Sequence, residues 1–166
     1  MDTQRVETRV AEAEYREQRV IIKPPTKRPW PWYAAAVVLF IGDRFLKSLA
    51  LGGTVRRLLP FVEFVLFKNS GIAFSLPLSD VVFWALALPV FGLLLYVFLA
   101  SALKGNAFVS GALFFILLGA VSNLGDRLFY QATIDYMLIV NRSAVNIADG
   151  MIVGSVLALI FKRKTV

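Results

Sequence analysis

Residues 81–103 read VVFWALALPVFGLLLYVFLASAL. This run has no charged residue, and as an α-helix it would be roughly 34 Å long, enough to cross the hydrocarbon core of a bilayer. Similar apolar runs occupy about residues 30–51, 107–124 and 145–161. The spacing of the four runs predicts a membrane protein with four transmembrane helices.

The composition indicates that lipid is the solvent for much of the chain. Hydrophobic residues make up 58% of the 166 residues and charged residues 17%, and the mean hydropathy is +0.69. A soluble domain of this size could not bury so much apolar surface. The first apolar run follows a long charged segment and lacks a small-residue cleavage site, so we do not interpret it as a cleavable signal peptide.

The net charge of +7 comes largely from the two ends of the chain. Clusters of Lys and Arg beside apolar runs are typical of cytoplasmic ends, so we expect both termini in the cytoplasm. The prediction divides the chain into a charged cytoplasmic tail, residues 1–29, and a transmembrane domain, residues 30–166. Nucleic-acid binding would require a basic stripe on a soluble module, and the sequence shows none. The basic residues at the ends are Arg5, Arg9, Arg16, Arg19, Lys23, Lys27, Arg28, Lys162, Arg163 and Lys164.

Residues 54–79 are apolar but irregular. Pro60 and Pro77 interrupt them, and short alternating stretches such as residues 62–65 favour strands over a helix. The predicted fold class is therefore an all-α membrane protein whose four transmembrane helices carry a small extracytoplasmic β-cradle or loop region.

The absence of Cys and His restricts the chemistry. It excludes disulfides, thiol nucleophiles, zinc sites built on Cys or His, and catalytic triads that contain His. Hydrolysis would have to depend on Asp, Glu, Ser, Lys or a bound water.

Three acids, Asp126, Asp135 and Asp149, lie close together in the sequence near one outer turn. An acid inside a membrane costs about 2.5 to 3.5 kcal/mol on insertion scales, so it is usually paired, buried or functional. Two neighbouring carboxyl groups in a poorly solvated site share a proton, because both cannot easily ionise. Such a pair can carry out aspartic hydrolysis: the ionised member takes a proton from water while the protonated member polarises the carbonyl.

Five short boxes, in order, resemble those of the lipoprotein signal peptidases (signal peptidase II), and the resemblance covers about residues 32–161. Ser122, Tyr136 and Val145 depart from the family pattern, which usually has Gly, Phe and Phe there. The segment between Asp135 and Asp149 is also short for the family. The boxes are Asp43-Arg-Phe-Leu-Lys47, Asn69-Ser-Gly71-Ile-Ala73-Phe74-Ser75, Asn123-Leu-Gly-Asp126-Arg127, Thr133-Ile-Asp135-Tyr136 and Asn146-Ile-Ala-Asp149.

The resemblance implies roles for these residues. Asp135 and Asp149 would be the catalytic dyad, and Asp43 and Lys47 would support the site or position the substrate. The residues implied to line or brace the site are Asn69, Gly71, Asn123, Asp126, Arg127 and Asn146.

The resemblance also implies a reaction and a location. The family removes the signal peptide of diacylglyceryl-modified prolipoproteins by cleaving before the lipidated Cys, without a metal or other cofactor, and globomycin inhibits it. It implies a multi-pass protein of the bacterial cytoplasmic (inner) membrane, in contact with membrane lipid, with its active site at the outer face.

Structural roles are the alternative for several of these residues. Asp149 could favour a helix N-terminus electrostatically, and Asp135 could be an ordinary loop acid. Further alternatives are an Asp126–Arg127 structural pair, an Asp43–Lys47 salt bridge, a turn shaped by Asn69 and Gly71, and close helix packing at Gly150 and Gly154.

The sequence also differs from the patterns of several other functions. Intramembrane aspartyl proteases of the Gly-x-Gly-Asp class would need a Gly at position 123, which is Asn. A rhomboid-like serine protease would need a His partner. A small transporter would place polar residues near the bilayer midplane, whereas here they lie toward one face. A membrane assembly factor or a catalytically inactive homologue stays open from the sequence.

Overall fold

The computed structural model describes residues 29–53, 56–71, 79–140 and 143–162. Most of the predicted tail, together with Arg163 and Lys164, lies outside these residues. So does the Ala73-Phe74-Ser75 part of the second box.

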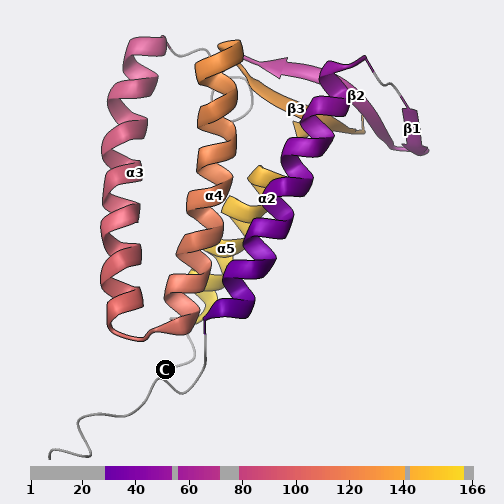
Figure 1. Ribbon diagram of the computed structural model, residues 1–166. Helices are drawn as coiled ribbons and strands as arrows, with labels where there is room; N and C mark the ends of the chain where they lie inside the picture. Colours follow the sequence, from indigo (N-terminus) through magenta and orange to yellow (C-terminus); the bar gives the residue numbers. More distant parts are fainter. Residues whose placement is uncertain (1–28, 54–55, 72–78, 141–142, 163–166) are drawn as a thin grey trace, which may run out of the picture.

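Four helices lie side by side (Figure 1): α2 (Trp30–Leu51), α3 (Asp80–Leu103), α4 (Ala107–Tyr130) and α5 (Ile147–Lys162). Each predicted apolar run forms one of them. Helix α4 contacts each of the other three helices, and α3 has no buried residue. A helix whose side chains are apolar and unburied is suited to contact with lipid.

Among the described residues, α3 and α4 are long and apolar enough to cross a membrane. Helix α2 carries the charged residues Asp43, Arg44 and Lys47, and α5 has only 16 residues, so neither counts as a candidate span. The chain is thus a largely helical protein with two candidate membrane spans, and four transmembrane helices stay a prediction.

The predicted end of the third run, near residue 124, is wrong. Helix α4 continues to Tyr130 and ends at Gln131, whose φ of 57° is left-handed. Because Asp126 and Arg127 are buried and have polar partners, the charged end of the run can stay helical. The longer helix places Asn123, Asp126 and Arg127 on one face.

The small β-region expected beside the helices is present as a four-stranded antiparallel sheet in the order β1-β2-β3-β4. The expected cradle segment forms β1 (Arg56–Leu59) and β2 (Val62–Asn69). Strands β3 (Thr133–Ile139) and β4 (Ser143–Val145) come from the segment between α4 and α5, for which no strand was predicted. Figure 1 shows the sheet at one end of the helices.

Two close contacts fix the sheet and α5 to the other helices. At the end of α2, Ala50 packs against Phe64 of β2 and Tyr136 of β3. Within the bundle, a Cβ on Gly119 of α4 would lie 2.7 Å from the carbonyl oxygen of Ala148 in α5.

The expected close packing at Gly150 and Gly154 is wrong. A Cβ at either glycine would meet no atom within 4 Å. Both glycines instead line a cavity, so Gly119 on α4 is the glycine that permits close approach of the two helices.

Candidate active site

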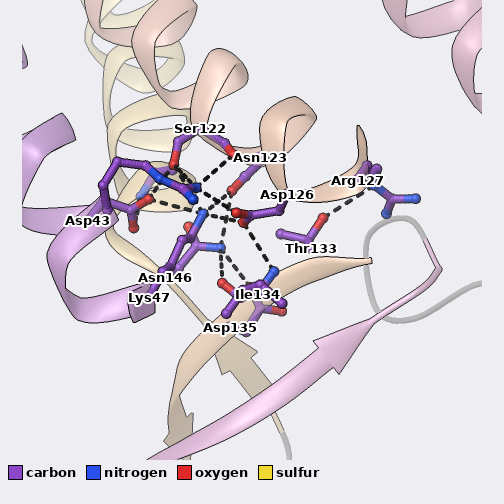
Figure 2. A network of polar contacts seen from close by, with 12 residues as sticks. Asp43, Lys47, Ser122, Asn123, Asp126, Arg127, Thr133, Ile134, Asp135 and Asn146 are labelled. Atoms are coloured by element: carbon purple, nitrogen blue, oxygen red, sulfur yellow. Dashed lines mark hydrogen bonds and ion pairs between the residues drawn. The ribbon is translucent and has the colours of Figure 1, made fainter. Parts of the chain in front are cut away.

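Buried polar side chains gather where α2, α4, β3 and the start of α5 meet (Figure 2). Burial of such groups is costly unless they find hydrogen-bond partners. Among the described residues, every buried side-chain nitrogen and oxygen has one. Of the acids, bases, amides and serines gathered at this site, those at most 2% exposed are Asp43, Lys47, Ser122, Asp126, Asp135 and Asn146.

Ion pairs within this cluster join α2 to α4. Lys47 Nζ lies 3.0 Å from Asp43 Oδ2 and 2.7 Å from Asp126 Oδ2. Arg44 Nη1 lies 2.5 Å from Asp126 Oδ1. The Asp43–Lys47 salt bridge that the sequence offered as an alternative therefore exists, and it is fully buried.

The Asp126–Arg127 pair is corrected, since Asp126 pairs with Arg44 and Lys47 instead. Asp126 Oδ2 also accepts a hydrogen bond from the backbone N–H of Ile134, at 3.2 Å. That contact holds the start of β3, one residue before Asp135. These contacts support the structural role that the sequence offered as an alternative for Asp126, although with different partners.

Ser122 lies at the centre of the ion pairs. Its Oγ donates to Asp43 Oδ2 at 2.6 Å and accepts from Lys47 Nζ and Arg44 Nη1, both at 3.2 Å. A hydroxyl can donate and accept at the same time, so Ser122 links groups of both charge signs.

Arg127 faces a different set of partners. Its guanidinium donates to the carbonyl oxygens of Ser70 and Gly71 and to Thr133 Oγ1, and its Cζ lies 4.1 Å from the centroid of the Phe83 ring. Arg127 thereby joins the end of β2 to the start of β3 and to α3.

The Asn69–Gly71 segment forms the expected turn, and it also reaches the site. Asn69 Oδ1 accepts from the N–H of Gly71 at 3.1 Å, which is a local turn bond. The Asn69 side chain also hydrogen-bonds Asp135. Asn69 therefore both shapes a turn and contacts the site, the two roles that the sequence offered as alternatives.

Asn146 connects the two candidate catalytic acids. Its Nδ2 donates to Asp135 Oδ1 at 2.6 Å. Its own N–H donates to Asp149 Oδ2 at 3.3 Å, and its Oδ1 accepts from the N–H of Asp149 at 2.8 Å. This reciprocal pair is a capping box, so Asp149 does have the expected position at a helix N-terminus. The same two bonds hold the Asp149 carboxylate close to Asn146.

Asn123 completes the link to α2. Its Nδ2 donates to Asp149 Oδ1 at 2.8 Å, and its Oδ1 accepts from Lys47 Nζ at 2.8 Å. Each acid therefore contacts at least one asparagine, and the asparagines lead to the buried ion pairs.

The surroundings of Asp135 change its acidity. Burial, and secondly the charge of Asp149, raise the pKa of Asp135 from 3.8 to about 6, against the opposing effect of hydrogen bonds from Asn146 and Asn69 and the charge of Lys47. A carboxyl group with this pKa keeps a proton far more readily near neutral pH than an ordinary aspartate.

An apolar cavity of about 640 Å³ reaches Asn146 and Asp149. It runs along α5, and a smaller cavity of about 220 Å³ continues toward Trp32. The residues common to the walls of both cavities are Phe115, Gly154 and Ser155.

Residues 35–163 match the family model described as signal peptidase (SPase) II. The chain belongs to this family. The resemblance inferred from the five boxes is confirmed, and the chain is a peptidase that processes lipoprotein signal peptides.

Several curated relatives of this signal peptidase II are named lipoprotein signal peptidase. The protein of Aquifex aeolicus (strain VF5) is 36% identical over 82% of this chain and 87% of its own length. That of Bartonella henselae is 30% identical over 83% and 91%. That of Coxiella burnetii (strain Dugway 5J108-111) is 29% identical over 70% and 77%.

Two solved structures described as a bacterial membrane enzyme share the fold of this signal peptidase II. One, at 2.3 Å resolution, has a TM-score of 0.67 and 20% identity, and the match covers 80% of this chain and 86% of the other. The second, at 1.9 Å, has a TM-score of 0.66 and 20% identity, with 81% and 93% covered.

The structure adds site residues that the sequence did not assign. Arg44 joins the ion pairs, and Ser122 and Tyr136, noted only as departures from the family, both bond Asp43. A signal for Arg44 was present, because a charged side chain within an apolar helix is expected to have a polar partner. Nothing in the sequence distinguished the hydroxyls of Ser122 and Tyr136 from those at the surface.

Proposed function

We propose that this signal peptidase II is an aspartic endopeptidase whose catalytic dyad is Asp135 and Asp149, and that it cleaves diacylglyceryl-modified prolipoproteins just before the lipidated Cys. The observation that carries the proposal is that Asn146 bonds both carboxyl groups, one from β3 and one from α5.

The two acids take different protonation states. Because burial raises the pKa of Asp135 to about 6, this carboxyl group keeps a proton more readily than an ordinary aspartate, and we assign to it the proton that the pair shares. Asp149 accepts hydrogen bonds from Asn123 and from the N–H of Asn146, and both bonds stabilise a carboxylate. Asp135 is the acid of the pair, and Asp149 is the base.

The reaction follows general acid–base catalysis. Asp149 takes a proton from a water whose oxygen attacks the scissile carbonyl carbon, while Asp135 gives its proton to the carbonyl oxygen. When the tetrahedral intermediate collapses, Asp135 regains that proton and Asp149 donates its own to the leaving nitrogen as the C–N bond breaks. Protons balance over the cycle, and no metal or other cofactor takes part.

The cavity beside Asp149 suits an apolar substrate. Its walls are almost entirely apolar, apart from groups such as Asn146 and Asp149 at the site end. An apolar signal sequence, or an acyl chain of the diacylglyceryl group, gains free energy by leaving water for such a cavity and loses little by leaving lipid for it. Globomycin, a cyclic peptide, is proposed to inhibit by competing for this region.

The four helices are proposed to cross the bacterial cytoplasmic (inner) membrane, in contact with its lipids. Helix α2 begins and α5 ends at the end of the bundle opposite the sheet (Figure 1), and Lys162 lies at that end. The positive ends of the chain favour the cytoplasm, so the sheet and the dyad lie at the outer face. Residues 1–29 are then a cytoplasmic tail, and residues 30–166 are the peptidase domain.

The proposal is tested with the isosteric variants Asp135→Asn and Asp149→Asn, assayed on a diacylglyceryl-modified precursor peptide. Each variant should lose cleavage entirely while still inserting into the membrane. The matched control is Asp80→Asn, which removes an exposed carboxylate at the start of α3 and should cleave normally. Robust turnover by either dyad variant would exclude the aspartic mechanism, and no cleavage by the unaltered protein would identify an inactive homologue.

A further inference from the structure

Tyr136 directly follows Asp135 in β3, and its side chain is 0% exposed. Successive strand residues point to opposite faces, so the Tyr136 ring packs away from the Asp135 carboxyl group. The ring lies 5.6 Å from that of Phe64, centroid to centroid, and contacts the end of α2 at Ala50. Contacts with two other elements, β2 and α2, therefore hold the phenol in place.

The Tyr136 hydroxyl makes two hydrogen bonds of 2.9 Å. It donates to Asp43 Oδ1 in α2 and accepts from the backbone N–H of Ile147, the first residue of α5. Each bond joins β3 to a different helix. The hydroxyl is thus a direct polar link between the strand that carries Asp135 and the helix that carries Asp149.

The first three N–H groups of α5 bond to three different side chains. Such groups have no partner inside their own helix. The Tyr136 hydroxyl accepts from Ile147, Asp43 Oδ1 accepts from Ala148 at 3.2 Å, and Asn146 Oδ1 accepts from Asp149 at 2.8 Å. Only the Asn146 bond is local, so the other two set where the helix begins relative to β3 and α2.

The direction of the hydrogen bond between Tyr136 and Asp43, with the phenol as donor, is also fixed. Burial, assisted by the charge of Asp43, raises the pKa of the Tyr136 phenol well above its usual range, although the bond from the N–H of Ile147 acts in the opposite direction. The hydroxyl therefore keeps its proton near neutral pH. It donates to Asp43, and its lone pair remains available to Ile147.

Asp43 is itself held firmly. Its Oδ2 bonds Lys47 and Ser122, and its side chain is 0% exposed. An anchor with this many contacts cannot easily follow a displaced helix, so the position of the α5 N-terminus depends on the groups that join it to Asp43.

We propose that the Tyr136 hydroxyl is a positioning group for the dyad: with Asp43 as its anchor, it holds the first turn of α5, and hence Asp149, at a set distance from Asp135. The inference rests on the proposed function, because it assumes that both acids take part in the reaction. Misplacement of a catalytic group by about 1 Å can cost as much as a hundredfold in rate.

The test is Tyr136→Phe, which removes a single oxygen and keeps the ring packed on Phe64. The matched control is Tyr96→Phe, which removes a hydroxyl from a side chain that is 68% exposed on α3. Both are compared with the unaltered enzyme for kcat and KM on a diacylglyceryl-modified peptide, for melting temperature, and for hydrogen exchange at the amides of Ile147 and Ala148.

For Tyr136→Phe we expect kcat to fall about tenfold, with KM within about twofold. Exchange should rise at Ile147 and Ala148 and stay unchanged in the middle of α4. Tyr96→Phe should match the unaltered enzyme in every measurement.

Three results would overturn the inference. One is unchanged kcat in Tyr136→Phe, with or without faster exchange. Another is a fall in kcat that accompanies a general loss of stability and faster exchange throughout the protein. The third is loss of the folded state, since the hydroxyl would then determine folding. None of these depends on Asp149→Asn, whose retained activity would instead remove the proposed function.

Discussion

Asn146 Nδ2 donates a hydrogen bond of 2.6 Å to Asp135 Oδ1. The same asparagine directly precedes α5 and forms the capping box with Asp149. One side chain therefore takes part in the fold and in the site at once. It caps the N-terminus of α5, and it bonds acids from two separate elements.

The two roles of Asn146 can be separated by comparing Asn146→Ala with the loss of a helix cap elsewhere. Loss of a helix cap costs about 1 kcal/mol of stability, and here the bond to Asp135 is lost as well, so we expect activity to fall at least about a hundredfold. The control is Asn106→Ala, since Asn106 caps α4 by accepting from the N–H of Val109 at 3.2 Å. Both variants should melt at a lower temperature, but only Asn146→Ala should lose cleavage. Equal activity of the two variants would remove Asn146 from the site.

The raised pKa of Asp135 makes stability depend on pH. Since folding raises this pKa from 3.8 to about 6, the folded protein favours the protonated carboxyl group. The stability gained from that group is complete below about pH 4 and is lost as the pH rises through about 6.

Asp135→Asn lacks this dependence, because an amide does not titrate in this range. We expect the variant and the unaltered protein to melt at similar temperatures near pH 4, and the variant to melt a few degrees higher above about pH 7. Thermal unfolding measured at several pH values in detergent checks this. A variant less stable than the unaltered protein at high pH would contradict the raised pKa.

The apolar cavity can be filled at Gly154. A Cβ there would meet no atom within 4 Å, so Gly154→Leu should fold and occupy part of the space that we assign to the substrate. We expect KM to rise by about tenfold, the effect that a few misplaced carbon atoms have in an apolar pocket, with a smaller change in kcat. Gly154→Ala should give an intermediate KM.

The control for this filling is Gly92→Leu on α3, where a Cβ is equally unobstructed and no residue of the cavity lies. Kinetics on the diacylglyceryl-modified peptide should show normal values for it. An unchanged KM in Gly154→Leu would show that the substrate binds elsewhere.

The positions of the helices could be predicted to within a few residues, except at the end of α4. The apolar run that gave α3 has no charge in it, so nothing competes with the helical prediction. The predicted end of the run that gave α4, near residue 124, is too early, because Gly125, Asp126 and Arg127 are typical of a polar helix end. Their burial depends on partners from α2, β2 and β3, and no local pattern contains those partners.

The sheet could be predicted only in part. Alternation in residues 62–65 indicated β2, but β3 is buried along its first half, from Thr133 to Tyr136, so its two faces do not differ in polarity. Its pairing of Phe67 with Asp135 and of Asn69 with Thr133 joins segments more than 60 residues apart in the sequence. Pairing over such a distance is decided by packing.

The sequence by itself determined the solvent of the helices, the exclusion of Cys and His chemistry, and the family, because each depends only on which residues are present and in what order. The tertiary structure alone decided which charges pair. Asp126 meets Arg44 and Lys47 and not its neighbour Arg127, and the Tyr136 hydroxyl meets both Asp43 and the start of α5. The physical reason is that a buried polar group must find a partner within about 3 Å, and only the packing of helices and strands brings distant parts of the chain that close.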